Sequence, residues 1–257
     1  MVQRWRLAAV PVARGGKLPI VSRGVERLCL FCAMPTFEQF RHRLQAFRSE
    51  GKKIFASTSF QGHSIPMLHM LMRIDPTVPV YYVNTGYLFP ETLRFRDTLK
   101  QLLGLDFIQL RPLVSKSQQL NAEGALMYSW DPDRDSYLNK VQPMERVLAE
   151  HDVWINGVRA DQSAVRKAMQ VEQPAAYGCL RYHPMLDWNA RMVHAYIKEH
   201  QLPPHPLEAE GYLSIGDMPY TRKAMEGYDA RTSRWYGLKK TECGLNTDLG
   251  ADKIKQP

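Results

Sequence analysis

The sequence predicts an α/β fold, a Rossmann-like parallel twisted sheet with helices on both faces. Short apolar runs rich in β-branched and aromatic residues alternate with segments of helical spacing, and small polar loops follow the apolar runs. Repeated alternation of this kind favours right-handed crossovers between parallel strands. Hydrophobic residues make up 44% and charged residues 23% of the chain, which excludes a disordered or fibrous protein.

The first predicted helix covers residues 36–51 and ends at Gly51. Thr36 is its N-cap candidate, and its apolar face consists of Phe37, Phe40, Leu44 and Phe47. Further helices are predicted at residues 64–76, 90–104, 143–151 and 192–200. Strands are predicted at residues 52–58, 78–86, 106–112 and 152–158.

The chain divides into three predicted parts. Residues 1–50 form a lead-in and a helix, and residues 51–219 form a nucleotide-binding α/β domain. Residues 220–257 lose apolar periodicity and gain charge, which is typical of a flexible C-terminal tail.

The formal net charge is +8, from 34 Lys and Arg against 26 Asp and Glu. Basic residues are spread among acidic ones until the last third of the chain, so a small anionic ligand is favoured over nucleic acid. No apolar run approaches the roughly 20 residues that a membrane-spanning helix needs. We therefore expect a cytoplasmic protein that binds neither membranes nor nucleic acid.

Four cysteines occur, at positions 29, 32, 179 and 243. A cytoplasmic location favours free thiols over disulfides. Cys29 and Cys32 form a CxxC inside an apolar run, so they are interpreted as buried small hydrophobes, with a redox pair or half a zinc site as the alternative.

Three loops follow predicted strands, where ligands of a parallel sheet bind. Residues 57–64 offer hydroxyls and a helix start to phosphate oxygens. Residues 84–92 turn at Gly86 before a helix with Pro90 near its first turn. Residues 157–166 carry Arg159 and Arg166, whose planar forks suit phosphate.

A single thiol in the predicted tail is the candidate nucleophile. Cys243 follows Lys239 and Lys240, and Arg231 and Arg234 precede them. A cationic neighbourhood lowers the pKa of a thiol and makes the thiolate available near neutral pH. The alternative interpretation is a stray cysteine in a solvated chain end.

The motifs NTGYLFPET, KVQPM, GVRADQS, HPLEAEGYLSIGD, TRK and ECGLN occur in this order along the chain. Together they resemble the sulfonucleotide reductases, specifically the 3′-phosphoadenylylsulfate reductase branch. The resemblance runs from about residue 50 to residue 246. It implies an adenine nucleotide α-hydrolase-like sheet.

The resemblance also implies a reaction and its partners. Cys243 would attack the sulfate sulfur of 3′-phosphoadenylylsulfate and become a thiosulfonate, and adenosine 3′,5′-bisphosphate would leave. Reduced thioredoxin or glutaredoxin would then release sulfite. The family is commonly homodimeric, which implies a homodimer here.

The implied site residues fall into two groups. Those on the nucleotide are Ser57, Thr58, Ser59, Thr85, Gly86, Tyr87, Gly157, Arg159, Gln162, Ser163 and Arg166. Those on the phosphosulfate are Lys140, Arg231 and Arg234, and Arg222 is a further implied substrate-binding residue.

A sister branch, the adenylylsulfate reductases, holds a four-iron cluster on a Cys-Cys pair and a CxxC. The matching positions here read Asp135-Ser136 and 217–220, DMPY, and such side chains do not ligate a cluster. We therefore expect no bound cofactor and the phosphorylated substrate.

The chain also departs from the family at two positions, Asn84 for aspartate and Asn246 for histidine. Three alternatives thus stay open: a clusterless adenylylsulfate reductase or specialised sulfonucleotide paralogue, an ATP-using adenylating or sulfur-transfer enzyme of the same superfamily, and a non-catalytic nucleotide sensor.

Overall fold

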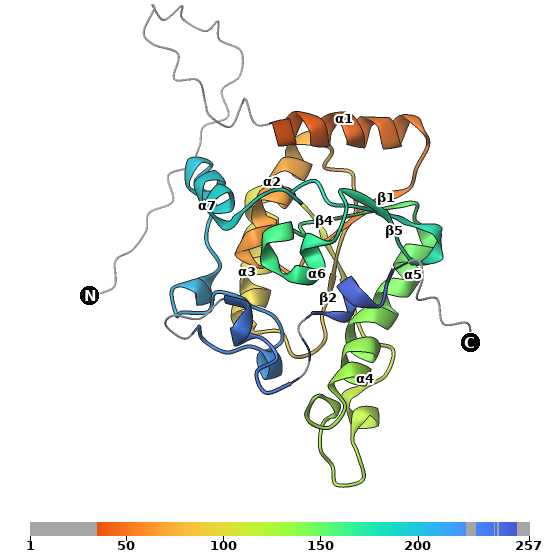
Figure 1. Cartoon of the computed structure of the whole chain (residues 1–257), viewed down its shortest axis with the longest axis vertical. Coiled ribbons are helices and arrows are strands. Elements are labelled where there is room, and N and C mark those ends of the chain that lie inside the picture. The colour runs from red at the N-terminus through yellow and green to blue at the C-terminus, as the bar shows by residue number, and fades with distance from the viewer. Residues whose placement is uncertain (1–34, 225–229, 239, 241, 251–257) are drawn as a thin grey trace, which may run out of the picture. The chain divides into compact units, whose positions relative to one another are not determined.

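Six strands form one sheet in the order β3-β2-β1-β4-β6-β5 (Figure 1). The computed structural model describes residues 35–224, 230–238, 240 and 242–250, so Cys29 and Cys32 lie outside the described part. The strands are β1 (Ile54–Ser57), β2 (Val80–Val83), β3 (Phe107–Leu110), β4 (Val153–Asn156), β5 (Glu172–Pro174) and β6 (Leu180–Tyr182). All neighbouring pairs are parallel except β5 and β6.

The predicted α/β class is therefore confirmed, and the sheet is parallel except at the β5–β6 pair. The α-helices are α1 (Pro35–Ser49), α2 (Ile65–Ile74), α3 (Pro90–Leu103), α4 (Pro132–Ser136), α5 (Gln142–Glu150), α6 (Ala164–Lys167), α7 (Ala190–Glu199) and α8 (Gly244–Thr247). A π-helical turn, Tyr137–Val141, joins α4 to α5. Short 3-10 turns include η1 (Gly62–Ser64), η5 (Ala160–Gln162) and η8 (Met218–Tyr220).

Helices cover both faces of the sheet because successive strand side chains point in opposite directions. On one face, Phe55 and Trp154 stack in a core cluster with Val147 and Leu148 of α5. On the other face, the ring of Tyr182 packs edge-on against Phe40 and Phe47 of α1.

The sheet register brings two loops together. Ser57, the last residue of β1, pairs with Asn156, the last residue of β4. The loops that follow these strands therefore start side by side at the carboxyl edge of the sheet. This edge holds the pocket described below.

One predicted detail of α1 is wrong. The helix begins at Pro35, whose fixed φ suits a first helical position, so Thr36 lies inside the first turn and is not the N-cap. The Thr36 hydroxyl instead accepts a hydrogen bond of 3.0 Å from Trp188 Nε1, and both side chains are buried. This contact ties α1 to the segment before α7.

None of the described helices is both apolar enough and long enough to cross a bilayer.

Replacing Thr36 by valine should destabilise the fold by about 1–3 kcal/mol, because the buried indole N–H of Trp188 loses its acceptor. Chemical unfolding measured by tryptophan fluorescence gives this value. Thr36→Ser, which keeps the hydroxyl, should remain close to the wild-type free energy. Equal losses in both variants would contradict the assigned role of the hydrogen bond.

Candidate functional site

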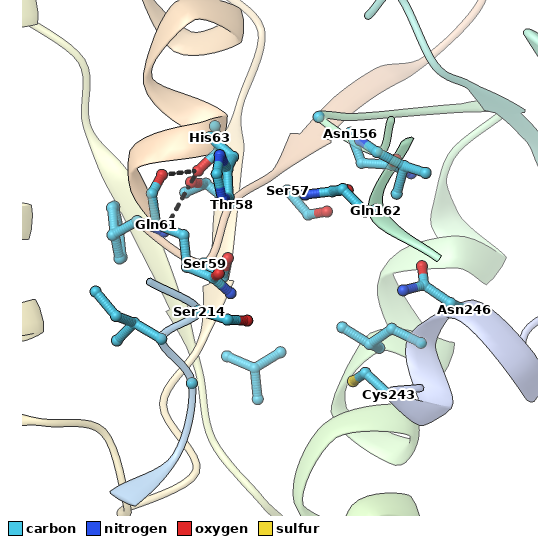
Figure 2. Close-up of a pocket in the computed structure, with 18 of the residues that line it drawn as sticks. Ser57, Thr58, Ser59, Gln61, His63, Asn156, Gln162, Ser214, Cys243 and Asn246 are labelled. Carbon is cyan, nitrogen blue, oxygen red and sulfur yellow. Dashed lines mark hydrogen bonds between the residues drawn. The ribbon is translucent and has the colours of Figure 1, made fainter. Parts of the chain in front are cut away.

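A pocket lies at the carboxyl ends of β1 and β4 and is closed on one side by the tail segment, defined here as residues 242–250. Figure 2 shows Ser59 and Ser214 on one side of the pocket, with Cys243 and Asn246 on the other. The predicted residues that line it are Ser57, Thr58, Ser59, Thr85, Lys140, Gly157, Arg159, Gln162, Arg166, Arg234 and Cys243.

The first loop uses some of its hydroxyls to hold its own shape. Thr58 Oγ1 donates to Ser64 Oγ at 3.2 Å and accepts the Phe60 N–H at 3.1 Å. Phe60 has a positive φ of 56°, which non-glycine residues seldom adopt. Ser57 Oγ accepts from Trp154 Nε1 at 2.7 Å, whereas Ser59 is exposed at the pocket. The loop is therefore preorganised around an accessible Ser59.

Three residues of the second loop were predicted to bind ligand, namely Thr85, Gly86 and Tyr87. Of these three, Thr85 alone lines the pocket. Thr85 is buried, and its hydroxyl donates to Asp217 at 2.7 Å. Gly86 is exposed, and Tyr87 packs its ring under Lys116, with the ammonium nitrogen 3.7 Å from the ring centroid. Asn84 Oδ1 accepts the Gly86 N–H at 3.1 Å, a bond that an aspartate oxygen at this position would also accept.

The third loop presents a buried arginine beside a buried amide. Arg159 is 2% exposed and its guanidinium binds Asp161 at 3.0 Å, while burial lowers its pKa despite this partner. Within the described residues, neither Arg159 Nη1 nor Asn156 Nδ2 has a hydrogen-bond acceptor. Both residues line the pocket, so these donors suit an anionic or carbonyl-bearing ligand.

Lys140 projects from the π-helical turn and forms a buried ion pair. Its Nζ lies 2.8 Å from Asp217 Oδ2, and the side chains are 13% and 2% exposed. Burial is the largest single effect and opposes both charges. The mutual attraction of the pair, its hydrogen bond and other nearby groups together outweigh burial, so the pKa of Lys140 is raised and that of Asp217 is lowered. Cys243 also interacts electrostatically with Lys140 and contributes to raising its pKa.

The positions that match cluster cysteines in the sister branch hold a hydrogen-bonded network. Asp135 accepts from Tyr220 Oη at 3.0 Å and from Asn139 Nδ2 at 2.8 Å. Asn139 Oδ1 in turn accepts from Lys116 Nζ at 2.9 Å. Among the described side chains, no three of histidine, cysteine, aspartate or glutamate are placed to share a metal ion.

Arg234 reaches the pocket because Gly216 leaves room for it. An added Cβ at Gly216 would lie 2.1 Å from Arg234 Nη2, so any larger residue would push the guanidinium away. Arg234 Nε donates to the Tyr220 carbonyl at 3.2 Å, and its side chain is buried. Arg222 is exposed and lies over the Tyr236 ring, while the side chain of Arg231 lies outside the described part.

Two cysteines are described, and their surroundings differ. Cys179 is 1% exposed within the apolar core, and burial raises the pKa of its thiol to about 12. Cys243 is half-buried, lines the pocket and precedes the short helix α8. Only the second thiol faces a space that a ligand can enter.

Three acidic residues at this site were not singled out from the sequence: Asp161, Asp217 and Glu242. Each is paired with a cation that was, namely Arg159, Lys140 and Arg166. Sequence reasoning also missed the buried Arg181, whose guanidinium stacks on Trp154 at 4.1 Å from the ring centroid. Its Nη2 donates to the Leu245 carbonyl at 2.6 Å.

Comparisons with known proteins identify a family. Residues 53–223 match the family model described as the phosphoadenosine phosphosulfate reductase domain. The phosphoadenosine 5′-phosphosulfate reductase of Alkalilimnicola ehrlichii is 37% identical over 251 residues, which cover 95% of this chain and 97% of that protein. The adenosine 5′-phosphosulfate reductase of Rhodococcus erythropolis is 36% identical over 181 residues, covering 70% of this chain and 73% of that protein.

A solved structure supports the fold. The phosphoadenylyl-sulfate reductase of Candida auris, in a phosphate complex, superposes with a TM-score of 0.63 at 22% identity. The match covers 79% of this chain and all of that one. At this identity the likeness supports the shared fold alone.

Replacing Asp217 by asparagine should cost about 3–5 kcal/mol at neutral pH, because the Lys140 ammonium would remain buried without its counter-ion. The lowered pKa of Asp217 means that its stabilisation is present above the ordinary aspartate value of 3.8 and is lost as the pH falls through the folded-state value. The gap between wild type and variant should therefore close in acid.

Urea unfolding at a series of pH values measures this gap. Asp187→Asn, at an exposed acid, is the matched control and should change stability little at any pH. A gap for Asp217→Asn that stays constant down to the most acidic pH would argue against the ion pair as its source.

Proposed function

We propose, from the premise that this chain belongs to the phosphoadenosine phosphosulfate reductase domain family, that it reduces 3′-phosphoadenylylsulfate to sulfite and adenosine 3′,5′-bisphosphate. The observation that carries the proposal is the position of Cys243. Its thiol lines a pocket that is also lined by Lys140 and Arg234. A nucleophile and two cations thus share one space.

The first step is a displacement at sulfur. The Cys243 thiolate attacks the sulfate sulfur, a sulfur–sulfur bond forms, and the bond from sulfur to the bridging oxygen breaks. The bond electrons leave with the nucleotide phosphate as adenosine 3′,5′-bisphosphate. The enzyme retains a thiosulfonate on Cys243.

The second step consumes a dithiol. One thiolate of reduced thioredoxin or glutaredoxin attacks the Cys243 sulfur and expels sulfite, which leaves a mixed disulfide. The second thiol of the same partner then attacks that disulfide and restores the Cys243 thiol. The partner supplies both electrons and leaves as its disulfide.

The cations have a defined task in the first step. Negative charge grows on the leaving phosphate as the sulfur–oxygen bond breaks, so Lys140 and Arg234 stabilise the transition state more than the bound substrate. Asp217 holds the Lys140 ammonium at 2.8 Å, which fixes its position before substrate arrives. No resident cofactor is needed for this chemistry.

The nucleotide is assigned to the opposite part of the pocket. Ser57 ends β1 and is followed by Thr58 and Ser59, and Thr85 follows β2, so these residues lie at the carboxyl edge, where ligands of a parallel sheet bind. Arg159 and Gln162 bind the ribose or phosphate oxygens. Arg159 Nη1 lacks an acceptor in the described part and is therefore available for such an oxygen.

Adenylylsulfate is the second candidate substrate. The observation that favours it is the Rhodococcus erythropolis relative, whose name specifies that nucleotide. The two candidates differ only by the 3′-phosphate. Comparison of kcat/KM for the two nucleotides decides between them.

The resemblance also implies a homodimer. Light scattering, which measures the molar mass in solution, tests this.

Cys243→Ser should abolish sulfite release, because a serine hydroxyl at neutral pH does not form the thiosulfonate. Binding of adenosine 3′,5′-bisphosphate, measured by calorimetry, should survive. After incubation of the wild type with substrate and without reductant, the intact-protein mass should show one added sulfonate. Peptide mapping should place it on the Cys243 peptide.

Cys179→Ser is the control, and it should retain turnover in all molecules that fold. Wild-type sulfite release by Cys243→Ser would refute the proposed function. Release of pyrophosphate from ATP without any thiol adduct would instead indicate an adenylating enzyme.

A further inference from the structure

We propose that Glu242 is the positioning residue for Cys243, and that Arg166 and Ser163 dock the tail segment instead of binding nucleotide. The inference rests on the proposed function, because it concerns how the thiol is presented to the activated sulfur. It changes the role predicted from the sequence for Arg166 and Ser163.

Glu242, the residue before the thiol, accepts hydrogen bonds from three residues of the described part. It is 3% exposed. Its Oε1 accepts from Ser163 Oγ at 2.5 Å, and the two carboxylate oxygens accept from Arg166 Nε and Nη2 at 3.1 Å each. Asn246 Nδ2 donates to Oε2 at 3.1 Å. Such a bidentate pair fixes orientation as well as position.

This contact joins distant parts of the chain. Arg166 and Glu242 are 76 residues apart, and the arginine lies in α6, just beyond the loop that follows β4. Ser163 is the N-cap of α6 and accepts the Arg166 N–H at 3.3 Å. Its hydroxyl therefore binds α6 and the tail segment at once, and it couples the loop to the thiol.

The residues after the thiol are anchored as well. Gly244 N–H donates to Ser136 Oγ at 3.4 Å, and Leu245 O accepts from the buried Arg181. An added Cβ at Gly244 would lie 2.7 Å from Val141 Cγ2, so the backbone approaches the π-helical turn closely. Cys243 is thus held between two fixed neighbours, and Glu242 supplies the charged contact.

All three nitrogens of the Arg166 guanidinium donate hydrogen bonds in this arrangement. Nε and Nη2 bind Glu242, and Nη1 donates to Gln162. A nucleotide phosphate would have to compete with this buried carboxylate for the guanidinium. Arg159, in contrast, lines the pocket with Nη1 lacking an acceptor among the described residues. The two arginines therefore divide tail docking from ligand binding.

The test compares Glu242→Ala and Arg166→Ala with Glu210→Ala, a control at an exposed glutamate. Three quantities are measured on the full chain: kcat and KM for sulfite release, hydrogen exchange of residues 242–250, and the Kd of adenosine 3′,5′-bisphosphate. Both docking variants should lose about tenfold or more in kcat and exchange faster in the tail segment. Their Kd should stay within about twofold of the wild type.

The opposite pattern overturns the proposal. If Arg166→Ala weakens nucleotide binding about tenfold while exchange of residues 242–250 is unchanged, Arg166 is a nucleotide ligand. The charge swap Arg166→Glu with Glu242→Arg should restore slow exchange and part of kcat relative to either single reversal. Absence of any restoration would also count against it.

Two further variants keep the outcome interpretable. Glu242→Gln preserves shape and removes charge, so it serves if the alanine variants do not fold, and it should show faster exchange with a normal Kd. Cys243→Ser should be inactive with wild-type exchange. Turnover by Cys243→Ser would refute the proposed function, whereas unchanged exchange in every Glu242 and Arg166 variant would refute the docking role alone.

Discussion

The site depends on one constraint, that three of the cations removed from water at the carboxyl edge of the sheet are each held by an acidic partner. Lys140 has Asp217, Arg159 has Asp161 and Arg166 has Glu242, at 2.8–3.1 Å. An unpaired buried charge would cost several kcal/mol, so these carboxylates decide which cations can lie beside the pocket and where. The two arginines differ in how many of their guanidinium nitrogens are hydrogen-bonded. Arg159 keeps a free nitrogen within the described part, whereas Arg166 commits all three.

The sequence predicts the cations better than their partners. Arginine, lysine and a tail cysteine are visible as residue types in motifs, and the strand-to-loop junctions place them at one edge of the sheet. Glu242 escapes because its pairing with Arg166 spans 76 residues and leaves no periodic pattern. Asp161 lies only two residues from Arg159, but its type and spacing do not mark it as an ion-pair partner. Asp217 lies in a matched motif, yet the motif assigns it no role. Its pairing with Lys140 exists only because η8 packs near the π-helical turn in the folded chain.

The fold shows the same division between local and distant information. Four strands and the longer helices have clear apolar spacing and lie where the sequence predicts them. β5 and β6 span three residues each, too few for a recognisable alternation, and their short connection makes them antiparallel. The π-helical turn has no marker in residue types, yet it carries both Lys140 and Asn139. Local spacing therefore specifies the scaffold, and tertiary packing specifies the site.

Arg181 makes the C-terminal segment part of the core as well as the carrier of a thiol. Its guanidinium is 1% exposed on β6, stacked on Trp154, and one of its bonds goes to the Leu245 carbonyl. A chain truncated before residue 242 would strip that acceptor and the Glu242 carboxylate from two desolvated arginines. Truncation is thus no substitute for a point change at the thiol, because an inactive shortened enzyme would report on lost folding stability as much as on lost chemistry.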